Sequence, residues 1–165
     1  MTKKKICMLG AFAVGKTSLV QRFVKSTFSD KYLTTVGVKV DKKEVIVDGR
    51  EVDLLIWDIH GEDDLQDIST SYLRGSAGFI LVADGTRKET LDCATDISKR
   101  VAEAKGALPT MLLLNKSDLE DDWEIDDVTI SQLEAQGWST QRTSAKTGSG
   151  VEDAFAALAR DVITA

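Results

Sequence analysis

The sequence predicts an α/β fold, a three-layer sandwich whose mostly parallel sheet lies between two layers of helices. The first observation is that short apolar runs alternate along the chain with longer segments of helical periodicity. The second is an Asp48-Gly49 turn between two strand-like segments, which requires one antiparallel pair at the edge of the sheet. No linker or change of composition divides the 165 residues, so we expect one domain over residues 1–165.

The first half of the chain supplies three strands and one helix. Residues 6–9 form a short apolar run that ends at Gly10, as is typical of a buried central strand. A glycine-rich turn and a helix follow, with apolar residues at helical spacing at Leu19, Val20, Phe23 and Val24. Residues 38–47 and 51–57 flank the turn and form a hairpin.

The second half continues the alternation. Residues 79–83 and 111–114 are continuous apolar runs, as expected of parallel strands covered on both faces. Residues 89–105 between them carry one apolar stripe and form a helix. A helix, a short strand and a final amphipathic helix complete the pattern, over residues 125–136, 138–143 and 151–163.

Charge and composition limit the function classes. The net charge is −6, from 27 acids and 21 bases, and such an acidic surface argues against a nucleic-acid partner. No apolar run approaches the roughly 20 residues that cross a bilayer. Thr2 is not a myristoylated glycine, and Ala165 is not a prenylated cysteine. We therefore expect a cytoplasmic monomer without a direct membrane anchor, with Cys7 and Cys93 as buried, reduced thiols.

The strongest motif occupies residues 10–17, Gly-Ala-Phe-Ala-Val-Gly-Lys-Thr, between the first strand and the first helix. This is the phosphate-binding pattern G-x-x-x-x-G-K-[ST]. The glycines let the backbone N–H groups turn toward a β-phosphate, Lys16 adds positive charge, and Thr17 offers a hydroxyl to Mg²⁺. The predicted phosphate-binding residues are Gly10, Ala13, Val14, Gly15, Lys16, Thr17 and Ser18.

A second motif selects the base. Asn115-Lys116-Ser117-Asp118 follows the apolar run 111–114, so it lies at the ligand-binding edge of the sheet. Asp118 can accept from the N1–H and the 2-amino group of guanine, a donor pair that adenine lacks. Lys116 can lie along the base, and Asn115 can tie neighbouring loops together. Alone, this tetrapeptide is equally compatible with a solvated loop; beside a phosphate loop it favours guanine.

Three weaker segments fall at the same edge. Ser144, Ala145 and Lys146 follow the last strand, where a backbone N–H can meet the guanine carbonyl. Asp58 closes the third strand and can reach Mg²⁺ through water, and Gly61 can present an N–H to a γ-phosphate. A threonine hydroxyl at residues 34–35 can also bind the metal. Alone, the tripeptide 144–146 is a weak signal, and the segments at residues 58–61 and 34–35 are more often an ordinary strand end or surface loop.

With these motifs in order, the chain resembles the Ras superfamily of small GTPases, most closely its Rab-like members. The strings Tyr72-Leu73-Arg74-Gly75 and Thr143-Ser144-Ala145-Lys146 add to the likeness. The resemblance implies a six-stranded sheet with about five helices, and binding of GTP or GDP with Mg²⁺. It implies that Phe28 packs on the guanine, that Thr35 belongs to switch I, and that partners bind through residues 30–37 and 61–74. The implied metal ligands are Thr17, Thr35 and Asp58, and the implied catalytic residues are Lys16, Thr35, Gly61 and Glu62.

Three positions depart from the family pattern. Glu62 replaces the glutamine that orients water, and a carboxylate cannot both donate to the γ-phosphate and accept from the water. Phe12 replaces a small residue at the place where a partner's arginine approaches. His60 replaces alanine and is either a proton-transfer group or an ordinary switch residue. We therefore expect slow hydrolysis.

Two other functions stay open at this point. One is a guanine-nucleotide-binding module that hardly turns GTP over and acts as a scaffold. The other is a phosphate-loop kinase or ATPase, which Asp118 and the absence of an arginine-rich lid disfavour. The lysines Lys39, Lys42 and Lys43 suit either an acidic partner or simple protection of an edge strand.

Overall fold

A six-stranded sheet forms the middle layer of the protein, in the order β2-β3-β1-β4-β5-β6. The computed structural model describes residues 2–25, 37–60 and 70–164. All neighbouring strands are parallel except β2 and β3, which form the antiparallel pair at one edge. The strands are β1 (Thr2–Gly10), β2 (Gly37–Val47), β3 (Arg50–His60), β4 (Ser76–Asp84), β5 (Thr110–Asn115) and β6 (Thr140–Arg142).

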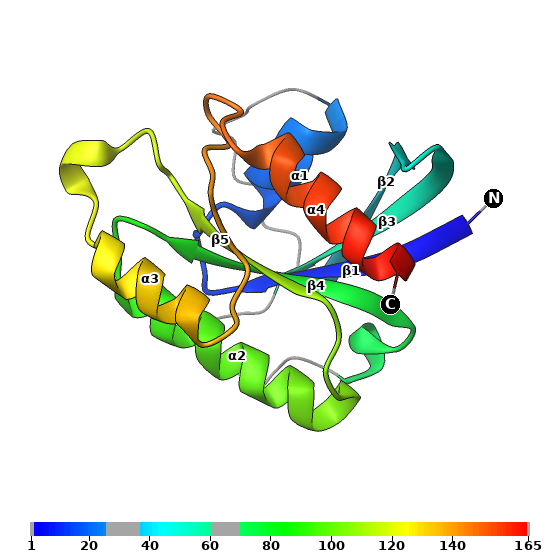
Figure 1. Cartoon of the computed structure of the whole chain (residues 1–165), viewed down its shortest axis with the longest axis horizontal. Coiled ribbons are helices and arrows are strands. Elements are labelled where there is room, and N and C mark those ends of the chain that lie inside the picture. The colour runs from blue at the N-terminus through cyan, green and yellow to red at the C-terminus, as the bar shows by residue number, and fades with distance from the viewer. Residues whose placement is uncertain (1, 26–36, 61–69, 165) are drawn as a thin grey trace.

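Helices cover the sheet from both sides, as the alternation of strands and helices predicts. In Figure 1, α1 (Lys16–Lys25) and α4 (Val151–Thr164) lie on one side of the sheet, and α2 (Glu89–Lys105) and α3 (Asp127–Ala135) lie on the other. Two short 3₁₀ helices, η2 (Thr70–Leu73) and η3 (Glu120–Asp122), lie in connections. The described ranges hold four α-helices, where the family resemblance implied about five.

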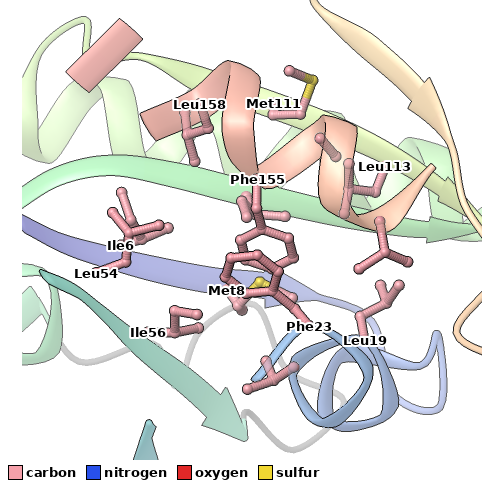
Figure 2. Packing of buried hydrophobic residues seen from close by; sticks show 14 of the residues in the cluster. Ile6, Met8, Leu19, Phe23, Leu54, Ile56, Met111, Leu113, Phe155 and Leu158 are labelled. Carbon is pink, nitrogen blue, oxygen red and sulfur yellow. The ribbon is translucent and has the colours of Figure 1, made fainter. Parts of the chain in front are cut away.

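Aromatic stacking fills the centre of the layer under α1 and α4. The rings of Phe23 and Phe155 lie parallel, with centroids 3.9 Å apart and 5° between their planes. Figure 2 shows this pair above Met8 of β1. Because the two phenylalanines come from α1 and α4, their stacking joins the first helix to the last. A second cluster, from Leu91 and Ile97 to Leu133, packs α2 and α3 on the opposite face.

The hairpin prediction is confirmed at the Asp48-Gly49 turn. Both residues have positive φ, 49° and 79°, as the tight turns that join antiparallel strands require. The register follows from this turn: Val47 pairs with Arg50 and Val45 with Val52. The pairing runs without a shift as far as His60, so the hairpin extends one long arm from the sheet's edge.

Several element bounds differ from the predicted ones. Strand β1 begins at Thr2, four residues early, and Lys5 places its ammonium 3.6 Å from the centre of the Trp57 ring. Helix α3 begins at Asp127 because the Asp126 carboxylate accepts from the Thr129 N–H at 2.7 Å, which caps the helix. Strand β6 is shorter than predicted, three residues instead of six.

The two cysteines differ in exposure. Cys7 is buried, as predicted, and burial raises the pKa of its thiol. Cys93 is only partly buried, because it packs at the margin of the hydrophobic cluster under α2; that prediction was wrong in degree. The two cysteines do not form a disulfide. None of the described helices is both long and apolar enough to cross a membrane.

Candidate nucleotide site

The described residues of the predicted site meet at one edge of the sheet. Strands β1, β4, β5 and β6 are parallel, so their carboxyl ends lie together, and β3 runs parallel to β1 beside them. The loop of residues 10–17 follows β1, Asp58 lies near the end of β3, and Asn115 ends β5. Ser144 follows β6. This is the edge at which open α/β sheets bind ligands.

The loop between β1 and α1 turns tightly. Ala13 and Gly15 have positive φ values of 60° and 101°. A Cβ on Gly15 would lie 2.3 Å from the Asn115 amide nitrogen, and a Cβ on Gly10 would lie 2.5 Å from the Val82 carbonyl oxygen. Both positions therefore require glycine because the chain passes too close to its neighbours for a side chain. The Val14 side chain lies in the core, which leaves only its backbone at the site.

Lys16 lies inside this loop and is 8% exposed. Its ammonium donates to the carbonyls of Gly10 at 2.8 Å and Ala11 at 3.3 Å. Burial lowers the pKa of Lys16, and the nearby Asp58 carboxylate opposes that shift. The loop thus surrounds one cation with its own backbone. Ser18, in the first turn of α1, is partly buried beside it.

Thr17 and Asp58 form a pair of oxygen donors. The Thr17 hydroxyl donates to the Asp58 carboxylate at 2.6 Å, and Asp58 is completely buried. A hydroxyl and a carboxylate are hard ligands that suit Mg²⁺, which keeps several water molecules and needs few protein groups. The donor set therefore fits the metal that the sequence predicts here.

Asn115 fastens three segments together from the end of β5. Its amide nitrogen donates to the Val14 carbonyl at 2.9 Å, across 101 residues of sequence. Its amide oxygen accepts from the Thr143 hydroxyl at 3.1 Å. Asn115 and Thr143 are both buried, with exposures of 2% and 0%. The prediction that Asn115 ties neighbouring loops together is confirmed.

Asp118 and Ser144 meet at the far end of the same edge. The Ser144 hydroxyl donates to the Asp118 carboxylate at 2.7 Å and accepts from the Thr147 N–H at 3.1 Å. A pocket of about 550 Å³ lies beside this pair, with Trp123, Arg142 and Ser149 among its lining residues. The two sequence motifs that we assigned to the base therefore contact each other directly.

Comparison with known proteins decides the family. The model of the Ras family matches residues 5–164. The chain belongs to the Ras family. The chain is 33% identical over 161 residues to Ras-related protein Rab-13 of Canis lupus familiaris, covering 96% of this chain and 79% of that protein. It is also 33% identical over 162 residues to Ras-related protein Rab-8B of Homo sapiens, covering 97% and 78%. It is thus a Rab-like small GTPase, a GTP-binding protein of the Ras superfamily.

Sequence reasoning missed Asp84 of this Ras-family protein, which ends β4 and is 1% exposed. One carboxylate oxygen accepts from the Thr86 N–H at 2.9 Å and its hydroxyl at 2.7 Å. The other accepts from Arg87 at 3.0 Å and Lys116 at 2.9 Å. Burial raises the pKa of Asp84, but the hydrogen bonds from Lys116, Thr86 and Arg87 outweigh it and hold the pKa below its ordinary value. A carboxylate closing the apolar run 79–83 was the signal that could have found it.

Arg22 is a second residue that the sequence did not reveal. From α1 it donates to the Ala145 carbonyl at 2.7 Å and to the Lys146 carbonyl at 2.6 Å. This small GTPase therefore holds the loop after β6 by a contact that spans 123 residues of sequence. No local pattern marks it, because Arg22 looks like any helix surface residue.

Several predicted positions lie outside the described residues of the GTPase. These are Phe28, Thr35, Gly61 and Glu62, together with most of the partner segments 30–37 and 61–74. Phe12 is described and is 48% exposed at the outer side of the loop. The described part of segment 61–74 includes Leu73, which is buried, and Tyr72, which is 37% exposed.

Proposed function

We propose that this Ras-family GTPase is a molecular switch that binds GTP and GDP with Mg²⁺ and hydrolyses GTP slowly. The observation that carries the proposal is the pair of hydrogen bonds made by Asn115. They hold a phosphate-type loop and a guanine-type loop in fixed relation. A bound nucleotide reaches both loops, with its base at the guanine-type loop and its phosphates at the phosphate-type loop.

The phosphates bind within the loop that follows β1. Backbone N–H groups between Ala13 and Ser18 face the α- and β-phosphates, aided by the positive end of α1. The Lys16 ammonium, now on the Gly10 and Ala11 carbonyls, contacts the β- and γ-phosphates. Burial lowers the pKa of Lys16, and negative phosphate charge beside the ammonium would oppose that shift as Asp58 does.

Thr17 and Asp58 hold Mg²⁺, with Thr35 as the further ligand of the triphosphate state. The supporting contact is the hydrogen bond between the Thr17 hydroxyl and the Asp58 carboxylate. Bound Mg²⁺ neutralises negative charge on the β- and γ-phosphates. Gly61 presents its N–H to the γ-phosphate.

Asp118 recognises the base by accepting from the guanine N1–H and 2-amino group. The hydrogen bond from Ser144 fixes the Asp118 carboxylate, so its orientation does not have to be set at the moment of binding. The backbone around Ala145 and Lys146, held by Arg22, meets the guanine carbonyl. Lys116 lies along one side of the base, held by Asp84, and Phe28 contacts the other side.

Hydrolysis rests on positioning and charge from Lys16, Thr35, Gly61 and Mg²⁺, with Glu62 at the water-orienting position. A carboxylate at Glu62 brings negative charge toward the γ-phosphate and cannot donate a hydrogen bond to it. Single-turnover GTP hydrolysis by the native protein, Glu62→Gln and Glu62→Ala tests this role. We expect Glu62→Gln to be faster than the native protein; equal rates for all three would remove Glu62 from catalysis.

One observation favours the second candidate, a nucleotide-binding scaffold with negligible hydrolysis. The Phe12 side chain is half exposed at the phosphate loop, where it obstructs the approach of a partner's arginine. The two functions separate when GTP-loaded protein is incubated for hours without a partner. Conversion of bound GTP to GDP supports the switch, and unchanged GTP supports the scaffold.

Partners bind through segments 30–37 and 61–74, which carry the state of the γ-phosphate to the surface. Support comes from family membership and from the exposed Tyr72 in the described part of the second segment. We propose that the protein meets these partners in the cytoplasm as a monomer.

A further inference from the structure

Arg87 connects the start of α2 to the middle of the phosphate loop. Its Nε donates to the buried Asp84 carboxylate at 3.0 Å, and its Nη2 donates to the Phe12 carbonyl at 3.0 Å. The second contact spans 75 residues of sequence. Both donors belong to one rigid, planar guanidinium, so the position of the Phe12 carbonyl is fixed relative to Asp84.

The place of that carbonyl gives the contact its consequence. Phe12 directly precedes Ala13, whose positive φ of 60° turns the backbone within the loop. A peptide unit is planar, so holding the Phe12 carbonyl also sets the direction of the Ala13 N–H on the same unit. Alanine prefers negative φ, so the left-handed conformation of Ala13 has to be stabilised by contacts with other residues.

Different side chains donate hydrogen bonds to the carbonyls of the phosphate loop. Lys16 binds those of Gly10 and Ala11, Asn115 binds that of Val14, and Arg87 binds that of Phe12. Lys16 is also the group that contacts phosphate in the proposed function, so its hold on the loop changes when a nucleotide binds. Arg87 and Asn115 are the contacts that do not depend on it.

Because Asp84 offsets the positive charge of Arg87, the effect of Arg87 on the phosphate loop is mainly geometric. The carboxylate lies 3.0 Å from the Arg87 Nε and 2.9 Å from the Lys116 Nζ, so it offsets positive charge on both. The Asp84 carboxylate thus binds both Arg87, which contacts the phosphate loop, and Lys116, which belongs to the guanine loop.

We propose that Arg87 is a positioning residue that sets the phosphate loop for the β-phosphate. This inference rests on the proposed function, since it concerns the same nucleotide. Arg87 does not touch the nucleotide; it acts through the Phe12–Ala13 peptide. It follows that Arg87 affects ligands with a β-phosphate and spares those without one.

The test compares the affinities of GDP and GMP for four proteins: native, Arg87→Met, Arg87→Lys and Lys88→Met. Lys88 is the matched control, because it is the adjacent cation and is exposed. We expect Arg87→Met to weaken GDP binding about tenfold, the size of one charge-assisted hydrogen bond, and to leave GMP binding within about twofold. Lys88→Met should leave both affinities unchanged.

Arg87→Lys separates geometry from charge. Lysine keeps the charge but offers a single nitrogen, which cannot hold Asp84 and the Phe12 carbonyl in a fixed relation. We therefore expect most of the loss in the ratio of GDP to GMP affinity to remain. Full recovery in Arg87→Lys would overturn the proposal in favour of charge alone.

The remaining outcomes are equally decisive. An unchanged GDP affinity in Arg87→Met, or an equal loss for GDP and GMP, would overturn the positioning role, the latter because it indicates a general structural defect. If the native protein binds neither nucleotide, the proposed function fails and not merely this inference.

Discussion

Replacing Asn115 with alanine tests the contact that joins the two halves of the site. The substitution removes the hydrogen bond to the Val14 carbonyl and the one from the Thr143 hydroxyl. Val14 and Thr143 are buried, with exposures of 1% and 0%, so water cannot readily replace the lost partners. Each unsatisfied buried group costs about 1–3 kcal/mol. We therefore expect Asn115→Ala to lower the free energy of unfolding by about 3 kcal/mol.

Thermal unfolding of protein freed of nucleotide measures the effect, because bound GDP would add any change in its own affinity to the Tm. For a chain of this length, about 3 kcal/mol corresponds to a decrease in Tm of roughly 6–12 °C. Thr143→Val is the matched control, since it keeps the shape and removes only the second bond, at a cost of about 1 kcal/mol. The double variant should lose less than the sum of the two, because both substitutions remove the same hydrogen bond.

The same variants should separate in nucleotide binding. Asn115→Ala frees the phosphate loop at Val14 and should speed GDP dissociation, whereas Thr143→Val leaves that contact in place. The reasoning is refuted if the free energy of unfolding of Asn115→Ala lies within about 0.5 kcal/mol of the native value, which is the range of ordinary surface substitutions. Equal GDP dissociation rates for the two variants would refute the link between the loops.

Two further predictions concern the carboxylates of the site. Asp118→Asn puts an N–H donor toward the guanine N1–H or 2-amino group, which are themselves donors. The substitution should therefore weaken binding of GDP about a hundredfold relative to binding of xanthosine diphosphate. An unchanged preference for guanine in a competition assay would contradict the role of Asp118. Asp84→Asn should cost about 2 kcal/mol at pH 7, because Lys116 and Arg87 are partly exposed and the loss is smaller than for a fully buried pair. The pKa of Asp84 is lowered by folding, so its stabilisation is present above pH of about 4 and is lost as the pH falls through the lower folded pKa. Urea unfolding at several pH values should therefore show the native protein and Asp84→Asn converging in acid, and a constant difference down to pH of about 2 would contradict this.

The elements that could be predicted are those specified by neighbouring residues. The helix predicted at residues 89–105 is observed as Glu89–Lys105, since its apolar stripe and the following Gly106 are local signals. The Asp48-Gly49 turn fixed the hairpin for the same reason. Strand β1 was predicted too short, because Lys5 packs over Trp57 of another strand and no local pattern reports that contact.

The residues of the site likewise divide into those that a local motif predicts and those that it does not. Asn115, Asp118 and Ser144 stand in short motifs at strand ends, and the topology alone brings them together. Arg22 binds the carbonyls of Ala145 and Lys146, 123 and 124 residues away, and Arg87 binds the Phe12 carbonyl 75 residues away, so neither belongs to a motif. Such contacts emerge only when the chain is folded, because they depend on the path of the backbone and not on residue spacing.

The most direct measurement is the affinity of Mg²⁺-supplied protein for GDP, GTP and ATP by titration calorimetry. The arrangement of Lys16 and Asp118 predicts tight, mutually competitive binding of GDP and GTP, with ATP failing to compete. Correctly folded protein that binds neither guanine nucleotide, or that binds ATP equally well, would contradict it.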